Sequence, residues 1–209
     1  MADTVHSAVY RWLQARGIRH VFGNPGSTEL GFLSDFPAEM HYVLALQESV
    51  ALAMADGYAQ ADRRPAFVNL HTAPGLGNAM GALFTALKNK TPLIVTAGQQ
   101  DTRMLRYDPL LSGPLVEMAR PLVKWAHQPA VAAEVPAALE RAYHIAMTPP
   151  AGPVFLSIPM DFWEQPAEYV EPRQVARAGT PSQDQLSSLA AALGAHDRDY
   201  GLGAEEGTG

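Results

Sequence analysis

The feature that most constrains the fold is an alternation of short apolar runs with longer segments of helical periodicity. The runs at residues 66–70, 92–97 and 154–158 are rich in apolar side chains, as expected of strands buried on both faces of a parallel sheet. Helical spacing fills much of the chain between the runs. Strands that alternate with helices form βαβ units. The sequence therefore predicts an open, doubly wound parallel α/β sheet with helices on both faces.

The same patterns set the expected order of the elements. Thr4 is a plausible cap of the first helix and Gly17 its end, and residues 23–27 read as a tight turn. Residues 98–121 form a long loop, and residues 161–181 have the composition of a linker. Helices are expected at residues 4–16, 27–36, 48–60, 75–87, 130–147 and 182–193, and strands at 18–22, 41–46, 66–70, 92–97 and 154–158.

Length and composition bound the class of protein. With 209 residues the chain fits one domain at residues 1–165, followed at 166–209 by a linker, a short helix and a tail. The net charge of -6 and the absence of a basic stripe argue against a nucleic-acid partner. The absence of cysteine excludes a disulfide framework and a thiolate nucleophile. No apolar run approaches the roughly 20 residues of a membrane span, so a cytoplasmic protein is the expectation.

Three polar residues follow predicted strands. Ser27, Glu48 and His71 each come just after such a strand, and in a parallel sheet the carboxyl ends of the strands meet at one edge, where ligands gather. Taken singly, each has a structural explanation. Ser27 is a plausible helix N-cap, Glu48 a favourable charge at a helix start, and His71 a core histidine. Their coincidence at one edge leaves a catalytic interpretation equally open, with Glu48 and His71 available for proton transfer.

A glycine-rich stretch follows His71. Residues 75–81 invite comparison with the dinucleotide motif G-x-G-x-x-G, but the third glycine comes one position late. The acidic residue expected about 20 positions later is also displaced. We therefore interpret these glycines as allowing a helix to approach its strand closely.

Several stretches together resemble the N-terminal, pyrimidine-binding domain of thiamine diphosphate-dependent decarboxylases and synthases. The resemblance covers about residues 5–190 and, within that family, is strongest toward the benzoylformate decarboxylases. It is carried by Val21-Phe22-Gly23-Asn24-Pro25-Gly26-Ser27, Ala45-Leu46-Gln47-Glu48, Ala55-Asp56-Gly57-Tyr58-Ala59, Asn69-Leu70-His71, Gly77-Asn78-Ala79-Met80-Gly81, Ala97-Gly98-Gln99-Gln100 and Arg120-Pro121-Leu122-Val123-Lys124-Trp125.

The resemblance implies roles for individual residues. Glu48 looks like the glutamate that hydrogen-bonds the aminopyrimidine ring of thiamine diphosphate and favours its imino tautomer. Ser27 looks like the residue that holds the substrate carboxylate. His71 looks like the acid or base nearest the reacting carbonyl oxygen, a task that suits imidazole. The cofactor-binding residues implied in this way are Asn24, Pro25, Gly26, Glu48, Gly75 and Asn78.

The resemblance also implies a substrate class and an assembly. A 2-keto acid would be decarboxylated by a carbon–carbon lyase. An aryl 2-keto acid such as benzoylformate is favoured by the loop leucines Leu110 and Leu111, and the absence of the paired histidines of pyruvate decarboxylases adds support. Leu110 and Leu111 match loop leucines that line the apolar substrate pocket. A structural cation is expected at Glu117, Met118 and Arg120. Full-length relatives are homo-oligomers with the cofactor between two subunits.

Two further domains of the family are absent from these 209 residues. They are a central domain and a diphosphate-binding domain whose Gly-Asp-Gly motif holds Mg²⁺, so the chain alone is expected to be inactive. Relatives continue after the last helix with an apolar strand and a Leu-Gly-Pro-like turn, unlike residues 199–206 here. A reading frame shifted by one nucleotide permits Ile-Met-Val-Leu-Gly-Pro-Lys, and we hypothesise a frameshift or premature end.

Two other interpretations remain open. The chain is also compatible with a non-catalytic α/β module that pairs with a partner chain. A carboligase of the acetolactate synthase kind is the second. Complementation with a diphosphate-binding domain separates an enzyme from such a module, because only the enzyme would then release CO2.

Overall fold

The computed structural model describes residues 3–174 and 181–199. Its internal contacts divide the chain into two compact units, Met1–Val175 and Ala176–Gly209, which are described separately. The first unit extends past the expected domain boundary at residue 165.

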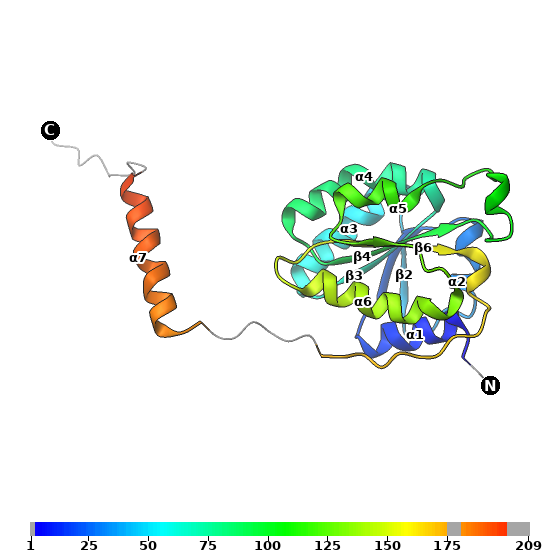
Figure 1. Cartoon of the computed structure of the whole chain (residues 1–209), viewed down its shortest axis with the longest axis horizontal. Helices are drawn as coiled ribbons and strands as arrows, with labels where there is room; N and C mark the ends of the chain where they lie inside the picture. Colours follow the sequence, from blue (N-terminus) through cyan, green and yellow to red (C-terminus); the bar gives the residue numbers. More distant parts are fainter. Residues whose placement is uncertain (1–2, 175–180, 200–209) are drawn as a thin grey trace. The chain divides into compact units, whose positions relative to one another are not determined.

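A six-stranded, all-parallel sheet forms the centre of the first unit (Figure 1). The strand order is β2-β1-β3-β4-β6-β5, so β2 lies on one side of β1 and the four later strands lie on the other. This arrangement confirms the predicted doubly wound α/β fold. The strands are β1 (His20–Asn24), β2 (His41–Leu44), β3 (Ala66–Leu70), β4 (Leu93–Gln99), β5 (Ala126–His127) and β6 (Val154–Pro159).

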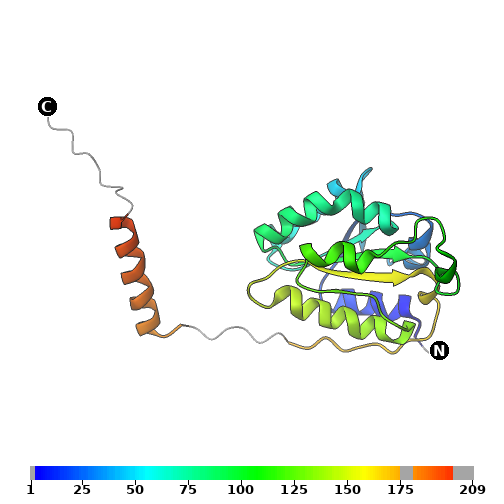
Figure 2. The same ribbon diagram turned by 45° about the horizontal axis from the view of Figure 1, so that its top comes forward.

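Helices cover both faces of the sheet because successive strand residues point to opposite sides. In β3, Phe67 packs into the core beneath α1, α2 and α6, whereas Val68 packs into the core beneath α3, α4 and α5. Figures 1 and 2 show α1 and α6 on one side of the sheet and α3, α4 and α5 on the other. The helices are α1 (Val5–Ala15), α2 (Leu30–Leu33), α3 (Glu48–Asp62), α4 (Thr72–Asn89), α5 (Leu115–Ala119) and α6 (Val135–Met147).

Several element boundaries differ from the predictions. Asn24 belongs to β1, not to a turn, because it pairs with Leu70 of β3. Helix α4 begins at Thr72, three residues before the glycine at which it was expected. Strand β5 has only two residues and was missed. The expected loop at 98–121 contains α5 and two single-turn helices, and short 3-10 turns occur at η1 (Ser27–Glu29), η2 (Leu105–Tyr107), η3 (Arg120–Leu122), η4 (Ala132–Glu134) and η5 (Met160–Phe162).

The segment of residues 163–173, which we call the strap, packs against α1 and α6, although the prediction treated it as part of a linker. Ala167 donates its backbone N–H to the carbonyl of Asp3 at 3.0 Å. The Arg11 guanidinium lies 4.1 Å from the centre of the Tyr169 ring. The backbone N–H of Arg173 donates to Glu140 Oε1 at 2.8 Å. The strap is therefore part of the first unit.

The second unit contains α7 (Gln183–Asp199), which begins close to the predicted position and runs longer. Its side chains at residues 183–194 are exposed, including Leu186, Leu189 and Leu193. The divergent tail at 200–209 lies outside the described residues. Among the described helices, none is both long and apolar enough to cross a membrane.

Candidate functional site

The carboxyl ends of β1, β2 and β3 lie side by side, because these strands are parallel neighbours in the sheet. Ser27 follows β1, Glu48 follows β2 and His71 follows β3. The structure therefore places all three positions along one edge of the sheet. Such an edge is where open α/β sheets bind ligands.

Glu48 is the first residue of α3, and only 6% of it is exposed. Asn24 Nδ2, at the end of β1, donates to Glu48 Oε1 at 3.2 Å. Asn78 Nδ2, in α4, donates to Oε2 at 3.1 Å. The N-cap of α3 is made by Gln47, whose side chain accepts from the backbone N–H groups of residues 49 and 50. The Glu48 carboxylate is thus held by two side-chain amides from other elements and is not used to cap its own helix.

Gly75 completes the surroundings of this carboxylate. A Cβ at this position would lie 3.2 Å from Glu48 Oε1, so a larger residue would press on the carboxylate. Gly77 and Gly81, farther along α4, are exposed. Of the predicted cofactor-binding residues, Asn24, Glu48, Gly75 and Asn78 are therefore brought together in one cluster.

His71 lies between β3 and α4, with 23% of its side chain exposed. Its Nδ1 is 2.8 Å from Glu29 Oε2 and 3.2 Å from Thr28 Oγ1. Gly26 lies directly against the ring, and a Cβ there would clash with it. The ring is therefore fixed on one side and open on the other, unlike that of a fully buried core histidine.

Glu29 is the residue that sequence reasoning missed. It is 1% exposed, and its Oε1 accepts from the Gly98 backbone N–H at 3.1 Å and from Thr28 Oγ1 at 2.6 Å. Its Oε2 accepts from the Gly26 backbone N–H at 2.8 Å as well as contacting His71. A Cβ at Gly98 would clash with this carboxylate, so the site requires glycine there. We infer that the imidazole donates from Nδ1 to Glu29.

A signal for Glu29 was present in the sequence. A glutamate three residues after a helix cap is half of a capping box, but three residues after the expected cap, Ser27, the sequence has Leu30. The cap is Gly26, and Glu29 reaches back to its N–H. The prediction that Ser27 is the N-cap was therefore wrong. Because glycine has no side chain that could cap a helix, the capping box at Gly26 could not be recognised from the usual sequence pattern.

The other predicted substrate-lining residues are more exposed. Ser27 is exposed, and its hydroxyl makes no hydrogen bond to the described residues. Pro25 is half-buried beside it. Leu110 is 86% exposed, whereas Leu111 is half-buried with a positive φ of 73°.

The loop that carries these leucines is fixed at its end. Gln99 Nε2 donates to the carbonyl of Gly113 at 3.1 Å. A Cβ at Gly113 would lie 2.8 Å from the Cβ of Ala73, near the start of α4. The end of the loop therefore lies beside the site, because Ala73 follows His71 by only two positions in the chain.

The predicted cation residues lie on α5 and in the turn that follows it. Glu117 and Arg120 are exposed, and Met118 is half-buried against α4. A cavity of about 360 Å³ is lined by Glu117, Arg120 and their neighbours. Within residues 3–174 and 181–199, no three His, Asp or Glu side chains gather in a way that could hold a metal. The cation stays a prediction.

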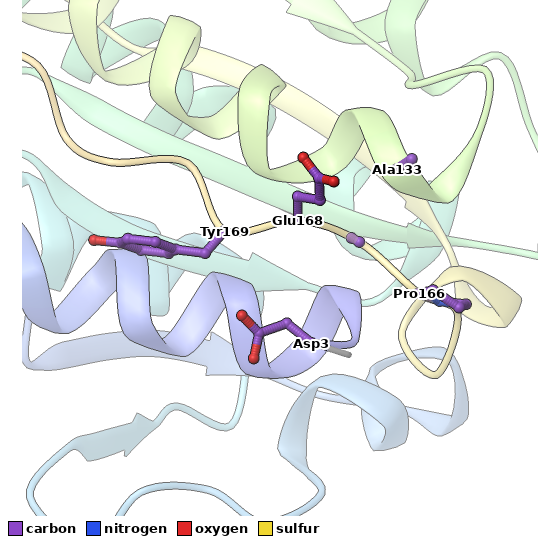
Figure 3. Close-up of a pocket in the computed structure, with 6 residues that line it drawn as sticks. Asp3, Ala133, Pro166, Glu168 and Tyr169 are labelled. Carbon is purple, nitrogen blue, oxygen red and sulfur yellow. The ribbon is translucent and has the colours of Figure 1, made fainter. Parts of the chain in front are cut away.

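A separate cavity of about 630 Å³ lies along the strap, next to Asp3 and to Ala133 of η4 (Figure 3). The figure shows Glu168 and Tyr169 on the strap and Asp3 just before α1. Ala133, Pro166 and Ala167 form the rest of the lining. None of the residues at the sheet edge lines it, so this cavity is distinct from the site.

Fold and site together define a doubly wound α/β domain with a fixed carboxylate and a carboxylate-bound histidine at its ligand-binding edge. Residues 3–128 match the family model described as "Thiamine pyrophosphate enzyme, N-terminal TPP binding domain". This match spans more than half of the 209 residues. The chain therefore belongs to the family of thiamine diphosphate-dependent enzymes and carries their N-terminal domain.

Individual relatives narrow the comparison. A benzoylformate decarboxylase of Pseudomonas aeruginosa is 49% identical over 191 residues, which cover 89% of this chain and 36% of the relative. A thiamine diphosphate-dependent 4-hydroxybenzoylformate decarboxylase of Rhodococcus jostii RHA1 has a similar structure, with a TM-score of 0.86 and 42% identity over 92% of this chain and 38% of that one. An acetolactate synthase large subunit of Buchnera aphidicola is 29% identical over 163 residues, covering 77% of this chain and 28% of the relative. The chain spans little more than a third of the length of the decarboxylases that it matches.

Proposed function

We propose that this chain supplies the pyrimidine-binding half of the active site of a 2-keto acid decarboxylase, with an aryl 2-keto acid such as benzoylformate as substrate. The observation that carries the proposal is the buried Glu48 carboxylate, held at the sheet edge by Asn24 and Asn78. The 49% identity to a benzoylformate decarboxylase supports the choice of substrate class.

The residues around Glu48 fit the aminopyrimidine ring of thiamine diphosphate. The two amides fix the carboxylate, and Gly75 leaves room beside it. Glu48 would hold the ring by a hydrogen bond and favour its imino tautomer, and Pro25 and Gly26 would line the same edge. When bound, the cofactor supplies the electron sink that accepts the electron pair left by departing CO2.

His71 would act on the substrate at its second ring nitrogen. Nδ1 is engaged by Glu29, and Nε2 has no hydrogen-bond partner among the described residues. The imidazole can therefore give or take a proton at the reacting carbonyl oxygen through Nε2. The exposed Ser27 hydroxyl would hold the substrate carboxylate, and Leu110 and Leu111 would contact the aryl group.

The helices beside Glu48 offer a surface for assembly. Val50 and Met54 of α3 and Phe84 of α4 are large apolar residues that remain exposed. A cavity of about 720 Å³ between α3 and α4 is lined by Val50, Met54 and Gly81, among others. Exposed apolar patches of this kind mark protein interfaces. We propose that this face packs against a second subunit, and that the diphosphate and Mg²⁺ are bound outside these 209 residues, so that the chain alone is inactive.

A chimera tests the proposed activity. Residues 1–190 of this chain would replace the corresponding part of the Pseudomonas aeruginosa benzoylformate decarboxylase, which is 49% identical over 191 residues. CO2 release from benzoylformate is expected. Glu48→Gln should lower kcat/KM by about 10²–10⁴-fold, because a neutral amide cannot take part in the proton transfer that favours the imino tautomer. Glu164→Gln serves as the control, because the Glu164 side chain is exposed and makes no hydrogen bond to the described residues.

The outcomes separate the competing functions. Unchanged turnover in the Glu48→Gln chimera would contradict the role proposed for this residue. Condensation of pyruvate without release of CO2 from benzoylformate would favour a carboligase like the acetolactate synthases. A folded chimera that binds the cofactor but turns over neither substrate would favour a non-catalytic module.

A further inference from the structure

Thr72 adopts a backbone conformation that its side chain disfavours. Its φ is +48°, in the left-handed region, where a β-branched residue is a genuine outlier. It is also the first residue of α4, directly after His71. Strain of this kind persists only where the surrounding structure fixes it, and it is concentrated at functional sites.

Four of the five other non-glycine residues with positive φ have simpler explanations, and the fifth, Leu111, lies in the loop between β4 and α5. Arg63, Lys90 and Asp108 are the C-caps of α3, α4 and η2, where a left-handed residue commonly ends a helix. Asp35 is of a type that tolerates this region. Among the described residues, Thr72 is therefore the one that is both β-branched and at the start of a helix.

The side chain of Thr72 adds a second cost. The residue is fully buried, and Oγ1 has no hydrogen-bond partner in the described structure. A buried hydroxyl without a partner is destabilising. Neither the backbone nor the side chain of Thr72 can therefore be explained by local stability.

The geometry points to Thr72 as a positioning residue for His71. Directly before Thr72 in the chain, the His71 ring is bound to Glu29 and lies against Gly26. Three residues after Thr72, Gly75 donates its backbone N–H to the His71 carbonyl at 2.8 Å and lies against Glu48. The sharp turn at Thr72 allows both contacts at once, so it sets the imidazole in a fixed place relative to the Glu48 carboxylate.

The restriction on Thr72 is what makes this turn a fixed joint. A threonine held with positive φ by its packing has few other conformations available, whereas glycine would move freely through this region. This inference rests on the proposed function in one respect, because the proposed function is what gives His71 a chemical task. The orientation of the ring can be measured in the chain without cofactor or substrate.

The test is NMR of the His71 ring nitrogens in the 209-residue chain at pH 9, where an ordinary imidazole is neutral. The parent chain should show one dominant tautomer, with the proton on Nδ1. Thr72→Gly should lower the ratio of the Nδ1–H to the Nε2–H tautomer at least twofold, while the Tm stays the same or rises. Thr72→Val, which keeps the branched side chain and removes the hydroxyl, should retain the parent spectrum.

A matched control comes from Thr91, whose hydroxyl is also buried without a partner among the described residues. Thr91 lies two residues before β4, at the end of that strand away from the site. Thr91→Val should leave the His71 spectrum unchanged. An unchanged tautomer ratio in folded Thr72→Gly would overturn the inference. So would a Thr72→Gly chain that fails to fold, because glycine relieves the strain on which the argument depends. Loss of activity in the chimera with an intact tautomer response would count against the proposed function and not against this role of Thr72.

Discussion

The buried carboxylate of Glu140 connects α6 with α1 and with the strap. It lies in α6 and accepts hydrogen bonds from Arg16, Trp12 and His144 side chains and from the backbone N–H of Arg173. Burial alone would raise the pKa of Glu140, but these donors outweigh it and hold the pKa at about 2. A carboxylate that accepts several hydrogen bonds is stabilised in its charged form.

The low pKa of Glu140 predicts a pH-dependent stability. Because the folded pKa lies below the unfolded value near 4.5, the stabilisation is fully present above about pH 4.5 and is lost as the pH falls towards 2. It amounts to about 3 kcal/mol. Glu140→Gln should therefore be strongly destabilised in urea at pH 7, and its difference from the parent should shrink as the pH falls through this window. Glu164→Gln should follow the parent throughout, and a constant difference for Glu140→Gln would contradict the prediction.

The positions of single residues were predicted where the local pattern was informative. Glu48 and His71 could be placed at the sheet edge because each follows a strand, and strand ends can be found from the sequence. Glu29 could not be identified in this way, because its partners His71 and Gly98 are 42 and 69 positions away along the chain. Only the folded sheet brings β1, β3 and β4 together.

Elements were predicted well where they were long and periodic. The strand at 66–70 was placed correctly, and α3 and α6 were found to within a few residues. Strand β5 was missed because a two-residue strand carries no periodicity. The start of α4 was placed too late because Thr72 begins the helix with a positive φ, which no propensity rule anticipates.

Helix α4 offers a paired test of what its glycines do. Gly81→Ala should stabilise the chain by about 0.5–1 kcal/mol, because a Cβ there meets nothing within 4 Å and alanine favours helix. Gly75→Ala gains the same propensity but presses on the Glu48 carboxylate. It should therefore be less stable than Gly81→Ala in urea unfolding and, in the chimera, bind thiamine diphosphate more weakly. Equal stability and equal cofactor binding of the two variants would show that Gly75 is not needed beside Glu48.

On the scale of the whole molecule, the sequence located the parallel sheet but not the end of its domain. Residues 161–181 read as a linker because they are rich in proline and charge. The strap nevertheless joins the first unit through contacts with α1 and α6, of which the first ends at Ala15 and the second begins at Val135. Such contacts leave no local pattern, since each residue of the strap meets a different partner.

Two shortened chains locate the boundary of the first unit. A chain ending at Gln174 keeps the strap and loses only α7 and its flanks, whose described side chains are exposed, so its free energy of unfolding should stay within about 0.5 kcal/mol of the parent. A chain ending at Gln165 loses the Arg173 bond to Glu140, the Ala167 bond to Asp3 and the stacking of Arg11 on Tyr169. It should be less stable by about 2–4 kcal/mol. Urea unfolding at pH 7 measures both, and equal stability of the two shortened chains would place the boundary at 165.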